Sequence, residues 1–168
     1  AKTFDAQAGY ESAMTLNAVL MAGANYIWHS AGWNEAGMHC STAKFIVDAE
    51  MCAMGYRMAQ GINWDDFDQA VAAIGDVGPG GHYLGHPHTL DNFQRAFFMP
   101  EMFDNNSIEQ WQAEGGIDIT ERALNRARTL LGEYEAPKLD PGVDEALCDY
   151  IARREREIPP ADALNQEY

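Results

Sequence analysis

The chain has 168 residues, of which 46% are apolar and 22% are charged, so it is long enough to bury the core of a single domain. It carries 26 acidic and 11 basic side chains, and the net charge of −15 disfavours binding to nucleic acids and to anionic membrane surfaces. Three cysteines without a Cys-x-x-Cys motif, and the lack of an apolar run of membrane-spanning length, predict a cytoplasmic protein with reduced thiols.

Helix-capping residues and helical periodicity predict a mainly α fold. Asp5 precedes the first apolar periodic segment, Ser41 or Thr42 the second, and Asp140-Pro141 the last. Glycines and prolines mark most of the expected helix ends. The expected helices span residues 5–22, 41–61, 64–74, 89–98, 107–115, 118–131 and 140–158, with Pro159-Pro160 ending the last one.

The segment 25–29 is the best candidate for a strand, because it combines aromatic and β-branched residues. A second short strand over 82–84 would pair with it. One or two strands are too few for an independent sheet, but a strand followed by a loop and an amphipathic helix resembles one βα unit of a barrel. We therefore expect residues 1–168 to form one unit, with βα units over 1–75 and a Gly/His loop and C-terminal helices over 76–168.

The segment 78–89, GPGGHYLGHPHT, concentrates four glycines and three histidines in one loop. Glycines allow the backbone to adopt positive φ and to approach a ligand closely, while the two prolines stiffen the loop. His82, His86 and His88 could supply three ligands to a catalytic zinc ion. The spacing is a weak zinc signal, because no Glu follows the first His as it does in the HExxH motif. We expect no metal, and expect these imidazoles to bind substrate through hydrogen bonds.

Four blocks of sequence carry a resemblance to a known family. They are FDAQAGYE at 4–11, AGANYIWHSAGW at 22–33, DAE at 48–50 and VGPGGHYLGHPHT at 77–89. In their order and spacing they resemble the C-terminal part of the trimethylamine:corrinoid methyltransferase family, over essentially the whole chain. The resemblance implies a C-terminal fragment of a TIM (β/α)8 barrel whose first part is absent. Pyrrolysine, the residue that marks the trimethylamine branch, does not occur in these 168 residues, but its position could lie in the absent part. The glycine betaine branch, which lacks pyrrolysine, is therefore equally open.

The resemblance implies a reaction in which a methyl group moves from a tertiary or quaternary amine to the Co(I) corrinoid of a partner protein. The cobalamin would therefore be supplied by that partner and not be bound by this chain. Aromatic rings suit such a substrate, because they hold cations through their faces. Tyr26, Trp28 and Trp33 are the candidate rings, His29 and Glu35 the candidate catalytic residues, and Glu35 could offset the positive charge.

The same residues are also compatible with different roles. Tyr26 and Trp28 could pack in a barrel core instead of at the mouth, where barrel enzymes place their active sites. A metal-dependent hydrolase would use the three loop histidines as ligands, and a non-catalytic helical assembly module would use none of these residues. Helices built to cover a barrel would keep apolar faces, so we expect the fragment to self-associate as a homo-oligomer and to be inactive alone.

Overall fold

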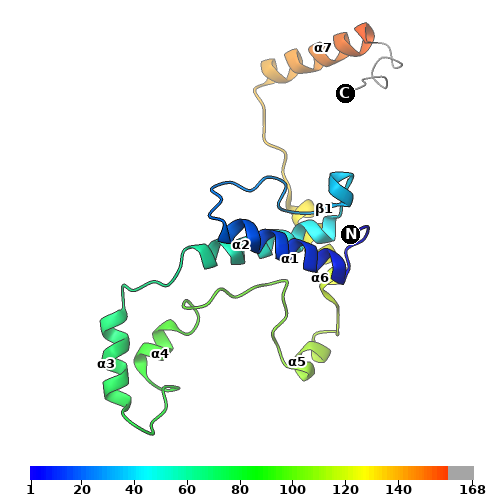
Figure 1. Cartoon of the computed structure of the whole chain (residues 1–168). Helices are drawn as coiled ribbons and strands as arrows, with labels where there is room; N and C mark the ends of the chain where they lie inside the picture. The colour runs from blue at the N-terminus through cyan, green and yellow to red at the C-terminus, as the bar shows by residue number, and fades with distance from the viewer. Residues whose placement is uncertain (159–168) are drawn as a thin grey trace. The chain divides into compact units, whose positions relative to one another are not determined.

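A computed structural model describes residues 1–158, and it confirms the prediction of a mainly helical chain (Figure 1). The two strands within residues 1–158 are β1, Trp33–Asn34, and β2, His39–Cys40, which flank a single turn of 3-10 helix, η1, Glu35–Gly37. The chain divides into two compact units, Ala1–Gly132 and a second unit that begins at Glu133. The α-helices are α1 Ala6–Met21, α2 Thr42–Ala59, α3 Phe67–Val77, α4 Pro87–Asn92, α5 Ile108–Ala113, α6 Ile119–Glu133 and α7 Pro141–Glu157.

Helices α1 and α2 begin and end close to where the sequence predicts. The Asp5 carboxylate accepts a hydrogen bond from the backbone N–H of Ala8 at 3.1 Å, and the Ser41 hydroxyl accepts one from Lys44 at 3.3 Å. Both side chains thus satisfy N–H groups that a helix leaves free at its first turn. The helices pack against each other, and Gly55 allows a close approach, since a Cβ there would lie 2.8 Å from Leu20 Cδ1.

The predicted strand at 25–29 is wrong, and so is the one at 82–84, because both segments form turns or irregular loop. His29 adopts a left-handed backbone conformation with φ of 55°, which interrupts an extended chain. A strand also requires a neighbouring strand for its backbone hydrogen bonds. The only pairing among residues 1–158 is the antiparallel one in which Trp33 lies opposite Cys40.

Helices α3 and α4 differ from their predicted bounds. The Asn63 side chain accepts a hydrogen bond from the N–H of Asp65, two residues further along, at 2.8 Å. This bond forms an Asx turn and not a helix cap, and α3 begins only at Phe67. Helix α4 begins at Pro87 and ends at Asn92, well before Phe98. The Asn92 amide donates to the His88 carbonyl at 2.7 Å, and such side-chain bonds compete with continuation of a helix.

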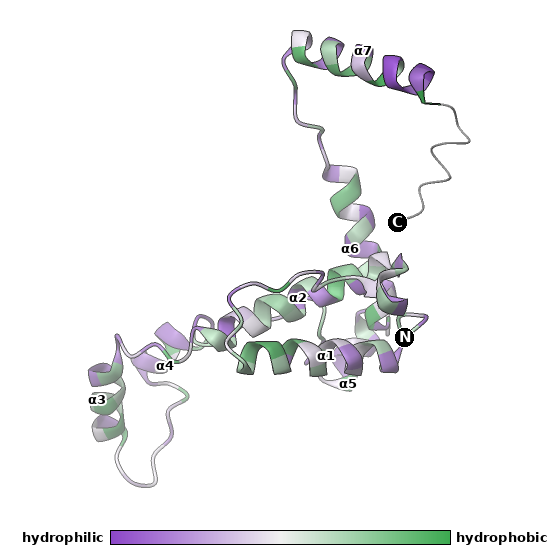
Figure 2. Cartoon of the chain, turned by 45° about the horizontal axis from the view of Figure 1, so that its top comes forward, coloured by the Kyte–Doolittle hydropathy of each residue, from purple (hydrophilic) through white to green (hydrophobic). Residues whose placement is uncertain are grey.

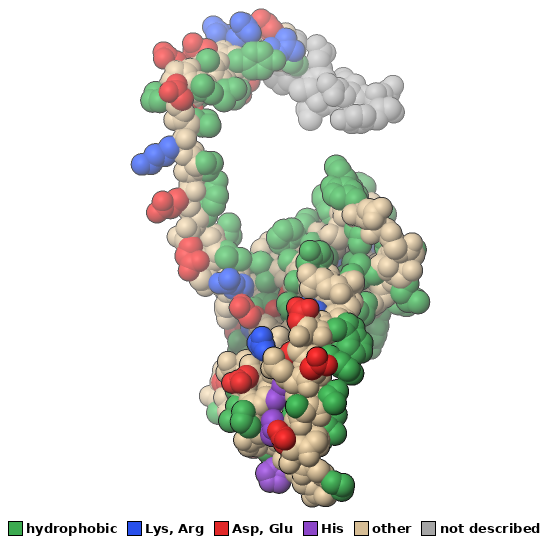
Figure 3. Space-filling view, turned by 90° about the vertical axis from the view of Figure 1, so that its left-hand side faces the viewer, with side chains coloured by type: hydrophobic (Ala, Val, Ile, Leu, Met, Phe, Trp, Pro, Cys, Tyr) green, Lys and Arg blue, Asp and Glu red, His purple; other side chains and the backbone are tan. Residues whose placement is uncertain are grey.

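The buried core of the first unit joins α2 to α6 through the loop before α5. Its buried residues are Ala43, Val47, Met102 and Ala123. Glu50 of α2 fastens that loop, because its carboxylate accepts hydrogen bonds from three consecutive backbone N–H groups at residues 101–103 over 2.5–3.2 Å. A core made mainly of small side chains leaves many large apolar residues exposed, and these are visible over the surface in Figure 3.

The second unit contains α7, which begins at Pro141 behind its cap Asp140, as the sequence predicts. The Asp140 carboxylate accepts hydrogen bonds from the N–H groups of Gly142 and Val143 at 2.9 and 3.4 Å. Figure 2 shows that the C-terminal half of α7 is mostly hydrophilic. The predicted end at Pro159-Pro160 lies outside the described residues. In the part of the chain that the structure describes, no helix combines the length and hydropathy needed to cross a membrane.

Candidate functional site

The loop between α1 and β1 gathers aromatic side chains into one row. The ring centroids of Tyr26 and Trp28 lie 5.7 Å apart, those of Trp28 and His29 5.4 Å, and those of His29 and Trp33 5.1 Å. Such tilted and edge-on arrangements are favourable for aromatic rings at these distances. Much of the Trp28 and Trp33 surface remains exposed. The loop therefore presents ring faces to its surroundings although it is not a strand.

Three of these rings line a cavity with the first two helices, which we call the aromatic pocket. Trp28, His29 and Trp33 line it together with both apolar and polar side chains of α1 and with one polar side chain of α2. Its volume is about 350 Å³, within the range of sites for small molecules. Those polar residues are Glu11, Ser12 and Thr15 of α1 and Lys44 of α2.

A buried ion pair holds the aromatic loop against the two helices. The Lys44 ammonium and the Asp48 carboxylate, both almost fully buried on α2, contact each other directly. Lys44 also donates to the Ser12 hydroxyl at 2.7 Å, and Asp48 accepts from the Gly32 backbone N–H at 2.8 Å. These bonds connect α1, α2 and the loop, so the ion pair positions the rings that follow and precede Gly32.

Only glycine fits at position 32. Its φ of 82° lies in the left-handed region, and a Cβ would come within 2.6 Å of Cys40 Sγ and 2.9 Å of Phe45 Cβ. Side chains larger than hydrogen are strained in this conformation and would clash here as well. The loop can thus approach α2 closely enough for the hydrogen bond to Asp48.

Glu11 gives the aromatic pocket a negatively charged group. Gln7 donates a hydrogen bond to the Glu11 carboxylate at 2.6 Å. Hydrogen bonds to a carboxylate stabilise its charged form, so this side chain is ionised at neutral pH. An anionic group beside aromatic faces suits a cationic ligand.

Glu35 does not line the aromatic pocket. Its carboxylate lies 3.0 Å from the Lys2 ammonium and 3.7 Å from His39 Nδ1. Its backbone is strained, with φ of 51°, and the next residue Ala36 has φ of 53°. The structure therefore brings His29 and Trp33 together but places Glu35 in a separate cluster.

The three histidines of the Gly/His loop lie beside α3 and α4 and not in the aromatic pocket. His86 Nδ1 accepts from the backbone N–H of His88 at 3.2 Å, which caps α4, while its Nε2 lies 3.6 Å from Asp76. His88 Nε2 lies 3.6 Å from Asp66 Oδ2 and is buried without a hydrogen bond among residues 1–158. His82 is exposed. Figure 3 shows histidine side chains next to carboxylates in this part of the molecule.

The structure does not favour a three-histidine metal site in this loop. Within residues 1–158, no three His, Cys, Asp or Glu side chains are grouped closely enough to hold a metal ion. The two histidines face different carboxylates, since His86 Nε2 lies near Asp76 and His88 Nε2 lies near Asp66. The hydrolase alternative lacks the convergent ligands that such an enzyme requires.

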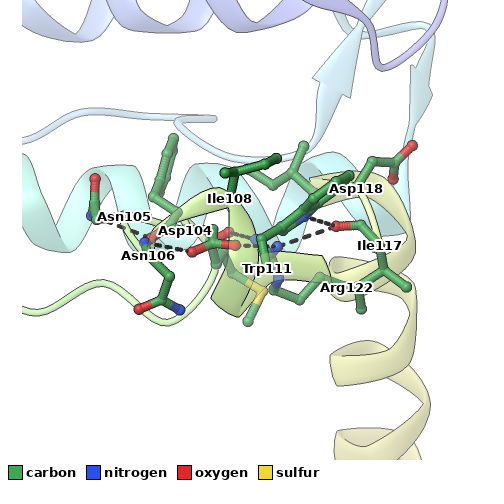
Figure 4. A pocket seen from close by; sticks show the side chains of 11 residues that line it. Asp104, Asn105, Asn106, Ile108, Trp111, Ile117, Asp118 and Arg122 are labelled. Carbon is green, nitrogen blue, oxygen red and sulfur yellow. Dashed lines mark hydrogen bonds and ion pairs between the residues drawn. The ribbon is translucent and has the colours of Figure 1, made fainter. Parts of the chain in front are cut away.

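A third set of polar residues, around α5, serves the fold (Figure 4). The Arg122 guanidinium donates to the carbonyl of Met102 and, at 3.3 Å, to that of Ile117, and it lies 3.5 Å from Asp104 Oδ2. Trp111 Nε1 donates to the same Ile117 carbonyl at 3.0 Å. Because these donors satisfy backbone carbonyls within the fold, Arg122 is a structural residue here.

Sequence reasoning missed Lys44, Ser12 and the role of Asp48. Lys44 appears as an ordinary charged residue of an amphipathic helix, and such residues are usually solvated. The only available signal was its spacing of four residues from Asp48, which places the two on one helix face. Burial of that face depends on the packing of α1, which the local pattern does not reveal.

The positions of these residues define a helical segment that carries an aromatic, partly anionic pocket. A profile of the trimethylamine methyltransferase (MTTB) family matches residues 1–159. The chain belongs to this family, which confirms the resemblance drawn from the four blocks of sequence.

Individual relatives agree with this assignment. The chain is 40% identical over 157 residues to a glycine betaine methyltransferase of Desulfitobacterium hafniense, covering 94% of this chain and 33% of the relative. It is 31% identical over 160 residues to the trimethylamine methyltransferase MttB of another strain of that species, covering 95% of this chain and 32% of the relative. MttB2 of Methanosarcina mazei is 30% identical over 158 residues, covering 93% and 31%. The chain spans about a third of the length of these relatives.

Proposed function

We propose that this chain is part of a methyltransferase that moves a methyl group from a methylated amine to the Co(I) corrinoid of a partner protein. The substrate is of the trimethylamine or glycine betaine type, because relatives at 40% and 31% identity carry those names. The observation that carries the proposal is the aromatic pocket, whose lining combines Trp28 and Trp33 with the carboxylate of Glu11.

Each pocket residue has a definite task in this reaction. The Trp faces hold the ammonium group through cation–π contacts, and Glu11 offsets its positive charge. His29, whose ring lies at a tilted angle to each of the two Trp rings, fixes their spacing. When the C–N bond breaks, its electron pair stays on nitrogen and a neutral amine leaves. The Co(I) corrinoid of the partner supplies the nucleophile, so the pocket must hold the methyl carbon in line with it.

We infer further that the segment is one part of a (β/α)8 barrel in the complete enzyme. In such barrels the active site is assembled from the loops of several βα units, so one segment holds only part of it. Residues 1–168 alone are therefore expected to show no turnover. Glu35 and the loop histidines, which lie outside the aromatic pocket, would take part only through other segments of the complete barrel.

The test is the substitution Trp33→Ala in a full-length methyltransferase that contains this sequence. We expect kcat/KM for glycine betaine or trimethylamine to fall about tenfold, which corresponds to the loss of ~1–2 kcal/mol of cation–π stabilisation. The measurement is the spectral change of the Co(I) corrinoid protein on methylation.

Trp64→Ala is the matched control. This tryptophan is also exposed and packs edge-on against Phe67 with ring centroids 5.4 Å apart, but it does not line the aromatic pocket. Its removal is expected to leave kcat/KM unchanged. Equal effects of the two substitutions, or turnover by residues 1–168 alone, would contradict the proposal.

A further inference from the structure

A second cavity, separate from the aromatic pocket, lies between the first turns of α1, the middle of α2 and the start of α6. Its volume is about 520 Å³, in the range of cavities that hold small organic molecules. Apolar side chains form most of its wall, and three of them are aromatic. These side chains are Phe4, Tyr10, Val47, Met51, Phe103 and Ile119.

All charged groups on the wall of this second cavity are carboxylates. Asp5, Asp48 and Asp118 line it, and among the residues that the structure describes no Lys, Arg or His does. Asp5 caps α1 and Asp118 caps α6. In the cap of α6, only Oδ1 of Asp118 accepts a hydrogen bond, from the Glu121 N–H at 2.8 Å. Asp48 is paired with Lys44, whereas Asp5 and Asp118 form no ion pair with a Lys, Arg or His among residues 1–158.

Asp48 supplies a buried acceptor to the second cavity. Its side chain is 3% exposed, and its Oδ2 atom is shared by Lys44 and the N–H of Gly32. Its other oxygen, Oδ1, accepts no hydrogen bond from residues 1–158. A carboxylate oxygen can accept further hydrogen bonds, and Asp48 lines the second cavity, so Oδ1 is available to a donor there.

We propose that the second cavity binds a small primary ammonium ion with an apolar body. The N–H groups of such a cation satisfy the unused carboxylate oxygens of Asp48 and Asp118, and its body packs against the aromatic rings. A quaternary ammonium has no N–H group to donate and would leave these oxygens unsatisfied. The ligand class therefore differs from that of the methyl donor, and this inference does not depend on the proposed function.

The experiment is a calorimetric titration of residues 1–168 with 2-phenylethylammonium. We expect saturable binding by the cation, and binding at least fivefold weaker for two controls, neutral 2-phenylethanol and tetramethylammonium. Asp118→Asn keeps a residue that caps helices well, and Tyr10→Ala removes a largely exposed ring, so both variants are expected to fold. Each is expected to weaken binding of 2-phenylethylammonium at least fivefold.

The variant Trp33→Ala distinguishes binding in the second cavity from binding in the aromatic pocket. It removes a ring from the aromatic pocket and is expected to leave the affinity for 2-phenylethylammonium unchanged. Loss of binding in Trp33→Ala with retention in Asp118→Asn would overturn the proposal. Equal affinity for 2-phenylethanol would also overturn it. So would the absence of 2-phenylethylammonium binding at concentrations up to about 10 mM, because a dissociation constant above that value is too weak for specific recognition of a small molecule. None of these three outcomes tests the proposed methyl transfer, which is measured by turnover.

Discussion

The aromatic loop before β1 and the Gly/His loop before α4 both combine glycines with ring-bearing side chains, but their surroundings differ. In the aromatic loop, a backbone N–H is bound by the buried pair Lys44–Asp48, which also contacts α1. In the Gly/His loop, His86 and His88 contact Asp76 and Asp66, of which Asp76 is largely exposed. In this chain, the ring-bearing loop that lines a pocket is the one whose backbone is hydrogen-bonded to a buried ion pair.

The largest expected difference between the two regions follows from removing one carboxylate in each. Asp48→Asn leaves the buried Lys44 ammonium without its ion partner, and losses of this kind cost about 3–5 kcal/mol of unfolding free energy. Asp76→Asn removes an exposed carboxylate 3.6 Å from His86 and is expected to cost about 0–1 kcal/mol. Urea titrations of both variants measure the difference. Similar midpoints would show that the ion pair does not fasten the aromatic loop.

Two glycines with nearly the same backbone angle provide the next comparison. Gly32 has φ of 82° and Gly80 has φ of 79°, but only at Gly32 would an added Cβ meet other atoms closer than 3 Å. Alanine at either position costs about 1–2 kcal/mol for the left-handed conformation. Gly32→Ala adds about 1–3 kcal/mol for overpacking against Cys40 and Phe45. Thermal unfolding should therefore rank Gly80→Ala above Gly32→Ala in stability, and the opposite ranking would contradict the close approach.

The smallest expected effect concerns the helix caps of the two regions. Hydrogen bonding from the Ala8 N–H lowers the pKa of the Asp5 carboxyl below its ordinary value. A lowered folded-state pKa means that the cap stabilises α1 above the unfolded-state pKa and is lost as pH falls through the folded-state value. Asp5→Asn keeps an uncharged cap, so its helical circular dichroism should lack this acid-dependent step. Helix α4 is capped by a ring nitrogen of His86 and has no such carboxylate.

A second cap variant provides the control for this pH comparison. Asp140→Asn changes the cap of α7 and leaves α1 untouched, so it should retain the acid step of α1. Identical acid titrations of the wild type and Asp5→Asn below about pH 4, where an ordinary aspartate titrates, would show that the cap contributes nothing measurable to α1.

Predictions from the sequence succeeded for features with short-range causes. The caps Asp5, Ser41 and Asp140 bind N–H groups two or three residues further along, so a local pattern contains everything that determines them. The strand at 25–29 failed because strands depend on a distant partner, and β-propensity describes packing against such a partner. Candidate site residues were identified by residue type and by family resemblance, which does not specify which of them share a pocket.

The sequence by itself determined the helices with capped starts, the acidic character and membership of the trimethylamine methyltransferase family. Only the tertiary structure decided that Trp28, His29 and Trp33 line one pocket while Glu35 lies outside it. The reason is the range of the contacts involved. Gly32 meets Asp48 across 16 residues of sequence, and Lys44 meets Ser12 across 32. Bonds over such separations form only when packing of α1 on α2 has excluded water from the pair, and no local pattern encodes that exclusion.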